Sequence, residues 1–152
     1  MNNIAGAKVG KTAVILINMG GPANLDEVRP FLYSLFNDSH IMSLRQPWRG
    51  LLARVISITR TPGVRKHYAL IGGGSPLKGW TDKQARKVQE LLALHKPDII
   101  VTTAYSYSFP RIKDSLVDLV DSGYENIIAC PLYPQYSMAT LGSVYADLEE
   151  GR

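Results

Sequence analysis

Residues 12–18, TAVILIN, form a continuous run of apolar and β-branched side chains. Such a run lacks the alternation of a strand with one face in water, so it predicts a strand buried on both faces of a parallel sheet. Gly20, Gly21 and Pro22 end this strand abruptly, and a helical pattern follows them. Because parallel strands need a crossover connection, usually a helix, this feature restricts the chain to an α/β architecture.

The last third of the chain repeats the same order of elements. Residues 98–107 read as a strand, 110–123 as a helix, 126–133 as a second buried strand and 139–151 as a helix. This alternation predicts a doubly wound, mostly parallel sheet flanked by helices, similar to the Rossmann arrangement. We expect one α/β domain over residues 1–152, with an incomplete sheet because three strands are few. Ligands of such sheets bind beyond the carboxyl ends of the strands.

The middle of the chain is expected to be helical with interruptions. Apolar residues at positions 28, 31, 32, 35 and 36 recur at helical spacing after a cap at Asn24 or Asp26. Residues 48–58 read as a short basic amphipathic helix, TRTPG as a break and 64–71 as another short helix. After the glycine-rich loop, Thr81 and Gln84 predict a capping box for a helix that ends near Leu94.

The charge distribution favours an anionic partner, and the composition argues against nucleic acid and a membrane span. Ten lysines and arginines lie between Arg45 and Lys87 against the single acid Asp82, which favours an anionic partner. The aromatic residues are not interleaved with these charges in a nucleic-acid-binding pattern, so we expect no nucleic acid. No apolar run is long enough to cross a bilayer, and we expect a cytoplasmic protein. The single cysteine, Cys130, lies in an apolar run, which predicts a buried, inert thiol.

Three glycine-containing segments are candidates for ligand contact. AGAKVGKT, residues 5–12, satisfies a relaxed P-loop spacing, but it precedes a strand instead of opening a helix, so we reject it as a phosphate site. Gly72 to Gly74 allow a smooth wall against a planar ligand, with a merely structural loop as the alternative. Met19 follows the first strand, and Tyr133, Tyr136 and Ser137 follow a later one. None of these places holds a histidine or paired carboxylates, so the sequence predicts the walls of a site without acid–base chemistry.

Four segments together resemble the ferrochelatase family, which inserts ferrous iron into a porphyrin at the end of haem synthesis. They are INMGGP, LDEVRPFLYSLFND, RTPGVRKHYALIGGGSPLKGWTDKQ and PLYPQYSMATLGS. The resemblance extends from about Lys11 to about Ser143 and covers the N-terminal half of the family. It implies that the C-terminal half is a missing partner, and that the histidine base and its glutamate lie there. The resemblance therefore assigns no catalytic residue and no metal ligand to this chain.

The resemblance implies a role for four porphyrin-binding residues. Met19 would lie over the macrocycle and favours protoporphyrin IX, while Arg60, Tyr68 and Ser75 occupy positions that contact the porphyrin and its propionates. Ferrous iron is a substrate, and we expect no bound cofactor. Leu32, Leu35 and Phe36 would form part of an apolar lip, and the stretch from Trp48 to Ile58 would contact the inner membrane peripherally.

Two departures from the family pattern matter. Ser106 precedes Tyr107 where the family usually has arginine before tyrosine, and Met138 stands where animal members have the first cysteine of an iron–sulfur cluster. We therefore expect no cluster ligand. Two other functions stay open: a non-catalytic tetrapyrrole carrier, and a basic domain that binds a nucleotide or nucleic acid.

Overall fold

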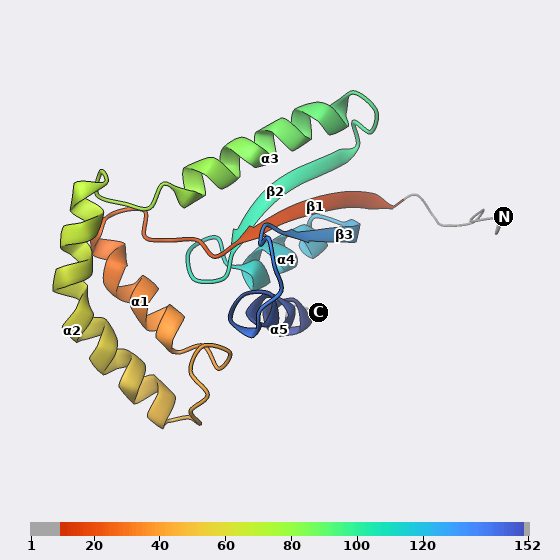
Figure 1. The fold of residues 1–152 in the computed structure, drawn as a ribbon. Helices are drawn as coiled ribbons and strands as arrows, with labels where there is room; N and C mark the ends of the chain where they lie inside the picture. Colours follow the sequence, from red (N-terminus) through yellow and green to blue (C-terminus); the bar gives the residue numbers. More distant parts are fainter. Residues whose placement is uncertain (1–9, 151–152) are drawn as a thin grey trace.

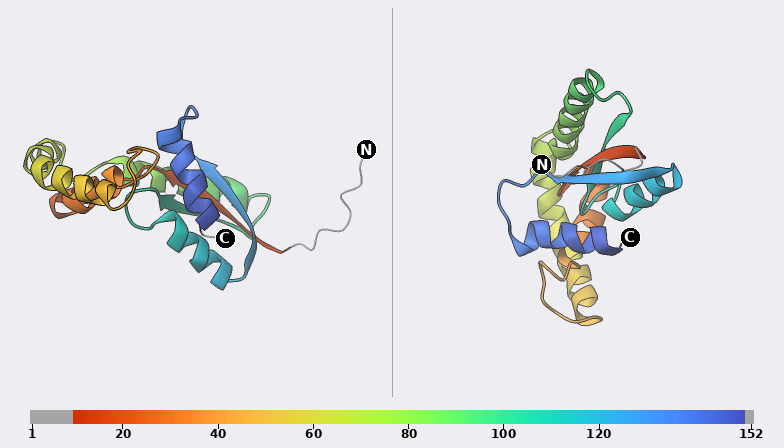
Figure 2. Two further views of the ribbon diagram at one scale, coloured as in Figure 1. Left: turned by 90° about the horizontal axis from the view of Figure 1, so that it is seen from below. Right: turned by 90° about the vertical axis from the view of Figure 1, so that its right-hand side faces the viewer.

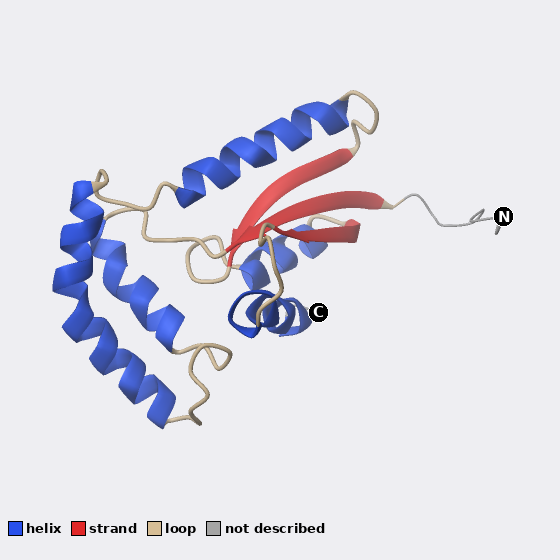
Figure 3. Cartoon of the chain, in the orientation of Figure 1, coloured by secondary structure: helices blue, strands red, loops and turns tan. Residues whose placement is uncertain are grey.

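The computed structural model describes residues 10–150 and contains a three-stranded parallel sheet (Figures 1 and 3). Its strands are β1 (Lys11–Asn18), β2 (Ile99–Tyr105) and β3 (Tyr124–Pro131), in the order β2-β1-β3. Both neighbours pair with β1 in parallel. The expected doubly wound α/β fold is confirmed. Residues 5–9 of the rejected P-loop pattern lie outside the described residues, whereas its Lys11 and Thr12 begin β1.

Helices cover both faces of this sheet (Figure 2). Helices α4 (Ile112–Asp121) and α5 (Ser143–Glu150) lie on one face, where alternate β1 residues meet them in the main core. That core consists of Ala13, Ile15, Ile17, Ala104, Ile112, Leu116, Leu119 and Val144. Helix α3 (Leu77–Ala93) lies on the opposite face and packs mainly on β2. The pattern of alternate residues turned to opposite helices explains why β1 needs apolar side chains throughout.

A helical hairpin stands away from the sheet (Figure 1). It consists of the short 3-10 turn η1 (Leu25–Glu27), α1 (Val28–Phe36) and α2 (Trp48–Leu70), and its two long helices pack mainly on each other. Of the two predicted caps, Asn24 caps the turn η1 that leads directly into α1: its Oδ1 accepts the N–H groups of Asp26 and Glu27. We call α1 and α2 with their connecting loop the helical arm.

The predicted break at TRTPG is wrong, because α2 runs without interruption through Pro62. Proline in a helix interior removes a hydrogen bond and costs roughly 3 kcal/mol. Contacts with the preceding elements continue on both sides of Pro62: the Arg60 guanidinium lies over the Phe36 ring at 5.9 Å, and Arg65 Nη2 lies 3.3 Å from Asp26 Oδ1. Packing against α1 and η1 therefore keeps α2 helical at Pro62, although the local sequence predicts a break there.

The predicted start of the next helix is also wrong. Helix α3 begins at Leu77, four residues before the expected capping box, and the Leu77 N–H donates to Ser75 Oγ at 3.3 Å. Thr81 is fully buried inside the helix, where its hydroxyl donates to the Leu77 carbonyl at 2.9 Å and accepts from Asn18 Nδ2 at 3.1 Å. Thr81 therefore joins α3 to the end of β1 instead of capping a helix.

The third strand differs from the expected buried strand. β3 is an edge strand whose residues alternate between partly buried and exposed from Ile127 onward, and Cys130 is exposed. Ile127 and Ala129 pack against the main core, whereas Ile128 is 52% exposed on the other face. The prediction of a buried thiol fails because α3 covers β2 and leaves this face of β3 open.

Candidate functional site

The carboxyl end of β1 leads into a turn whose backbone is held on both sides. The Met19 N–H donates to Asn18 Oδ1 at 2.8 Å, and the Met19 carbonyl accepts the Tyr107 N–H at 3.1 Å. Asn18 is in turn fixed by Thr81 of α3. The partly buried Met19 side chain is thus presented from a strand end that two other elements hold in place.

Ser75 packs directly on this turn. Its N–H donates to the Pro22 carbonyl at 2.7 Å, and a Cβ added to Gly21 would meet Ser75 Cβ at 2.5 Å. A Cβ on Gly74 would collide with the carbonyl oxygen of Ala23. Glycines at 21 and 74 are therefore needed because two chain segments touch, and the structure brings Ser75 next to the turn that follows Met19.

Tyr68 is joined to the same loop through the backbone. Its carbonyl accepts the Gly73 N–H at 2.8 Å at the C-terminal end of α2, and partial burial raises the pKa of its phenol. Gly72 and Gly73 have φ angles of 99° and 89°, and nothing lies within 4 Å of a Cβ built on either. Both glycines serve the left-handed turn, and the space beside them is open.

Arg60 lies farther along the arm. It is exposed, two helical turns before Tyr68, which corresponds to about 12 Å along the helix axis. Its guanidinium rests over Phe36, one of the expected lip residues, while Leu32 of that set is buried. The structure therefore links three of the predicted residues, Met19, Ser75 and Tyr68, through adjoining loops, and places Arg60 on the arm about two helical turns from Tyr68.

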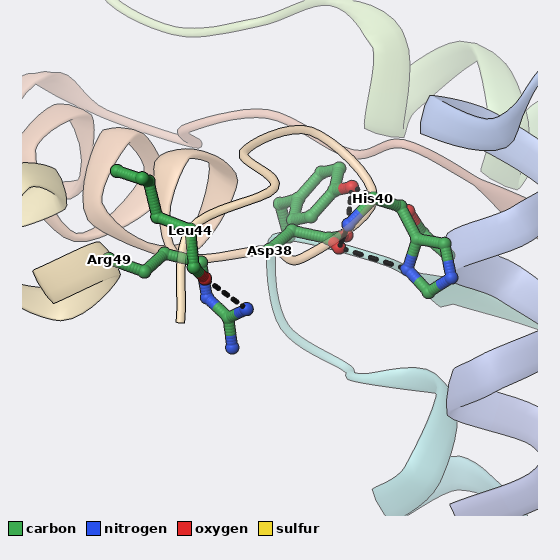
Figure 4. A network of polar contacts seen from close by, with 6 residues as sticks. Asp38, His40, Leu44 and Arg49 are labelled. Carbon is green, nitrogen blue, oxygen red and sulfur yellow. Dashed lines mark hydrogen bonds and ion pairs between the residues drawn. The ribbon is translucent and has the colours of Figure 1, made fainter. Parts of the chain in front are cut away.

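A polar network that sequence reasoning missed lies beside this turn (Figure 4). Tyr107 donates its hydroxyl to Asp38 Oδ2 at 2.6 Å and lies 3.2 Å from Ser143 Oγ. The Asp38 carboxylate also accepts the His40 N–H at 2.7 Å. These residues come from the loop after α1, the loop after β2 and the start of α5. Only the topology joins them, so no local sequence signal could have revealed the network.

Burial and hydrogen bonding in this network and its cavity shift the pKa values of Asp38, Tyr107 and Asp147. Burial raises the pKa of Asp38, but hydrogen bonds from Tyr107, Ser143 and His40 outweigh that effect and hold it below its usual value. Burial and the neighbouring Asp38 carboxylate raise the pKa of Tyr107 well above that of a free phenol. Burial raises the pKa of Asp147, in the same polar cavity, to about 6, although Arg111 opposes the shift.

Three cavities lie outside the predicted porphyrin residues. The polar one, of about 270 Å³, is lined by the network residues together with Arg49 and Asp147. The second, of about 260 Å³, lies between Pro22, Phe31 and the loop containing Ser108. The third is a groove of about 800 Å³ along β3. None of the three is lined by Met19, Arg60, Tyr68 or Ser75.

Within residues 10–150, no group of three histidine, cysteine, aspartate or glutamate side chains is arranged to hold a metal ion. None of the helices in this range is both long and apolar enough to cross a bilayer. Of the residues after β3, Tyr133 packs against the core and Tyr136 is exposed. The arrangement can bind and orient a ligand.

Fold and strand-end turn together define a doubly wound α/β protein of the class that binds its ligand beyond the carboxyl ends of parallel strands. Residues 11–152 match the ferrochelatase family model. The ferrochelatase of Aquifex aeolicus is 43% identical over 142 residues, which cover 93% of this chain and 44% of that protein. The chain belongs to the ferrochelatase family.

Two further relatives agree with this assignment. The ferrochelatase of Cyanothece sp. is 40% identical over 143 residues, covering 93% of this chain and 37% of the relative. Ferrochelatase-2, chloroplastic, of Cucumis sativus is 41% identical over 143 residues, covering 92% of this chain and 28% of the relative. The chain therefore spans less than half the length of the curated relatives it matches.

Proposed function

We propose that this chain is the porphyrin-binding part of a ferrochelatase, a lyase-type chelatase that inserts ferrous iron into protoporphyrin IX to make protohaem. Met19, Arg60, Tyr68 and Ser75 contact the porphyrin. The observation that carries the proposal is the interlocking of the two segments that bear Met19 and Ser75, where Ser75 packs on the turn after Met19. Two segments that contribute to one pocket must be held in a fixed relation, and glycines 21 and 74 permit that contact.

The chemistry divides between this chain and a second part. Insertion requires two pyrrole N–H protons to leave, and a pocket that holds the ring non-planar exposes the nitrogen lone pairs to iron. Arg60 suits the propionate end, because a guanidinium forms two charge-assisted hydrogen bonds with one carboxylate. We assign the base to the length of the family that this chain does not span. The 152 residues alone should bind porphyrin weakly without metallating it.

Porphyrin titration, followed by fluorescence, tests the site. Arg60→Ala and Tyr68→Ala should each weaken protoporphyrin binding by about ten-fold, since each removes a direct contact. Arg54→Ala is the matched control, because Arg54 is exposed on the same helix and lies outside the proposed site. Equal affinities for the Arg60→Ala and Arg54→Ala variants would contradict the assignment of Arg60.

Reconstitution tests the reaction. The chain joined to the remaining length of the Aquifex relative should form metalloporphyrin from ferrous iron, whereas the 152 residues should not. Binding of porphyrin without insertion in the joined protein would favour a tetrapyrrole carrier. Binding to DNA or RNA that weakens steeply with salt and is unaffected by Tyr68→Ala would instead favour the nucleic-acid alternative suggested by the basic middle of the chain.

We also propose that the arm touches the inner membrane from the cytoplasm. The start of α2 exposes an apolar stripe with arginines at positions 45 and 54 beside it, and Trp48 is 67% exposed. The other exposed members of the stripe are Leu51, Leu52, Val55 and Ile58. Vesicles of phosphatidylcholine and anionic phosphatidylglycerol should shift the Trp48 emission to the blue in a Trp80→Phe background. An unchanged spectrum at saturating lipid would refute the contact.

We propose that the chain has no resident cofactor. Met138 is exposed just before α5, at the position of the cluster cysteine of animal members, and a thioether does not replace a thiolate ligand of an iron–sulfur cluster. The joined protein, purified without oxygen, should contain less than about 0.1 acid-labile sulfide per chain. A stoichiometric sulfide content with the absorption of a cluster would overturn this proposal.

A further inference from the structure

Asp38 lies where the helical arm meets the loops of the sheet (Figure 4). It is the second residue after α1, and its side chain is only 13% exposed. Its Oδ2 accepts the Tyr107 hydroxyl at 2.6 Å, and its Oδ1 accepts the His40 N–H at 2.7 Å. Burial opposes ionisation, but hydrogen bonds keep the pKa of Asp38 below its usual value, so the group is a carboxylate at neutral pH. The contact with Tyr107 is therefore charge-assisted, which is the stronger class of hydrogen bond.

On the side of the arm, Asp38 is linked to Arg60. Asp38 belongs to the turn that closes α1: its N–H donates to the Leu35 carbonyl at 3.4 Å, and its carbonyl accepts the Met42 N–H at 2.8 Å. Phe36, two residues before Asp38, has its ring 5.9 Å from the Arg60 guanidinium. Since α1 and α2 pack mainly on each other, the position of Asp38 is coupled to that of Arg60.

On the side of the sheet, Tyr107 links Asp38 to Met19. Tyr107 is 5% exposed, and its N–H donates to the Met19 carbonyl at 3.1 Å. The neighbouring Ser106 N–H donates to the Asn18 carbonyl at 3.0 Å. The turn after β1 is thus bonded to the same short segment whose tyrosine hydroxyl the arm holds. Because a close-packed side chain shifts together with its own backbone, the place of Met19 depends on where Asp38 holds Tyr107.

We propose that Asp38 is a positioning residue for porphyrin binding. Through Phe36 on one side and Tyr107 on the other, it fixes the distance between Arg60, at the propionate end of the proposed site, and Met19, at its macrocycle end. Two contacts on separate parts of a chain bind one ligand well only when their spacing is already set, because ordering them on binding lowers the affinity. The inference rests on the proposed function and adds to it a residue outside the four that contact the porphyrin.

Amide exchange in the porphyrin-free chain tests the link between Asp38 and Met19. Asp38→Ala removes both acceptor oxygens, so the Tyr107 N–H, which is bonded to the Met19 carbonyl, should exchange about five-fold faster. Asp147→Ala is the control, because Asp147 is a carboxylate that lines the same polar cavity, whereas the Tyr107 hydroxyl is bonded to Asp38. Unchanged exchange of the Tyr107 N–H in Asp38→Ala would overturn the inference, whether or not the chain binds porphyrin.

Titration with two porphyrins tests the link to Arg60. Asp38→Ala should weaken the binding of protoporphyrin IX by about five-fold and leave that of its dimethyl ester within about two-fold, because the ester has no carboxylate for Arg60 to pair with. A loss of folding would instead weaken both ligands alike. Asp147→Ala should change neither affinity. If Arg60→Ala weakened protoporphyrin binding but Asp38→Ala affected both ligands equally, or neither, the inference would fail and the proposed function would stand.

Tyr107→Phe tests the same hydrogen bond from its other end with a smaller change. It should weaken protoporphyrin binding by the same factor as Asp38→Ala, and the double variant should bind no more weakly than Asp38→Ala alone, since both act through one contact. Losses that multiply in the double variant would show that Asp38 acts by another route and would overturn the inference. Equal affinities of the unaltered chain and Arg60→Ala would contradict the proposed role of Arg60, and this inference with it.

Discussion

The three glycines at 72–74 serve two different physical needs. Gly72 and Gly73 take left-handed φ angles beside open space, whereas Gly74 lies against the backbone of Ala23. The sequence predicted a wall for a flat ligand, and the open space beside the first two leaves room for one. The contact at Gly74 is between two parts of the chain itself.

Replacing Gly74 therefore tests the interlocked loops. Gly74→Ala should lower the free energy of unfolding by about 2 kcal/mol, because the added methyl group displaces a backbone segment that Ser75 holds through Pro22. Gly79→Ala is the control: nothing lies within 4 Å of its added Cβ in α3, and a helical alanine should stabilise by up to about 1 kcal/mol. Urea denaturation measures both. A loss no greater than 0.5 kcal/mol at Gly74 would contradict this packing.

Asp147 should make the protein less stable as pH rises. Its folded pKa of about 6 lies above the unfolded value of 3.8, so the folded state binds more protons between these pH values. The free energy of unfolding should therefore fall between pH 4 and pH 6, by about 1 kcal/mol once screening by water is allowed for. Asp147→Asn should remove this fall and be the more stable protein at pH 7.

Asp38 should change the free energy of unfolding with pH in the opposite direction to Asp147. Hydrogen bonds hold its folded pKa below 3.8, so its contribution is present above that pH and is lost as the pH falls further. Asp38→Asn should consequently be less stable than the wild type at pH 7. Thermal melts from pH 3 to pH 7 measure both carboxylates, and an Asp147→Asn profile that retains the fall above pH 4 would contradict its assignment.

At the level of elements, α2 gives the sharpest prediction, because it contains Pro62 and Gly63 within one continuous helix. Pro62→Ala should raise the free energy of unfolding by about 1 to 3 kcal/mol, since alanine restores the N–H that the helix lacks there. Gly63→Ala should add only about 1 kcal/mol through helix propensity, because nothing lies within 4 Å of its added Cβ. A smaller gain at Pro62 than at Gly63 in urea denaturation would mean that α2 is interrupted there.

The sequence predicted a helix or strand correctly where its own pattern of apolar residues determines it. The prediction failed where contacts with distant residues determine the structure. TAVILIN forms most of β1, and residues 99–105 of DIIVTTAYSY form β2, because both runs are rich in apolar and β-branched side chains. Pro62 was read as a break and Thr81 as a cap because a local window does not reveal long-range contacts. Arg60, next to that break, lies over Phe36. Thr81 accepts a hydrogen bond from Asn18. Cys130 was expected to be buried because a single strand does not reveal that it lies at a sheet edge.

The same limit applies to the candidate site. Glycines and a strand end identified the neighbourhood of Met19 and Ser75, since backbone geometry leaves a local signal. The hydrogen bond between Tyr107 and Asp38 left none, because 69 residues separate its partners. Long-range polar contacts of this kind require the fold.

The whole molecule consists of a packed sheet and a helical arm that buries fewer residues. α2 has 23 residues but buries only Ala53 and Ser57, whereas β1 buries four of its eight. Arg60 and Tyr68 lie on the arm and Met19 follows β1, so the proposed porphyrin site depends on how the two parts are joined. The hydrogen bond from Tyr107, which follows β2, to Asp38, at the end of α1, is one such join.

Hydrogen exchange should therefore show the arm opening before the sheet. Amides of α2 should exchange faster than those of β1, because fewer buried contacts must break. Tyr107→Phe should speed exchange in α1 and α2 by about ten-fold while leaving β1 unchanged, since it removes a hydrogen bond to a charged group. Tyr145→Phe is the control, because it makes the same chemical change at an exposed tyrosine of α5, outside the arm. If Tyr107→Phe accelerated amide exchange in β1 as much as in α2, arm and sheet would open as one cooperative unit. The hydrogen bond from Tyr107 to Asp38 would then not hold the arm independently of the sheet.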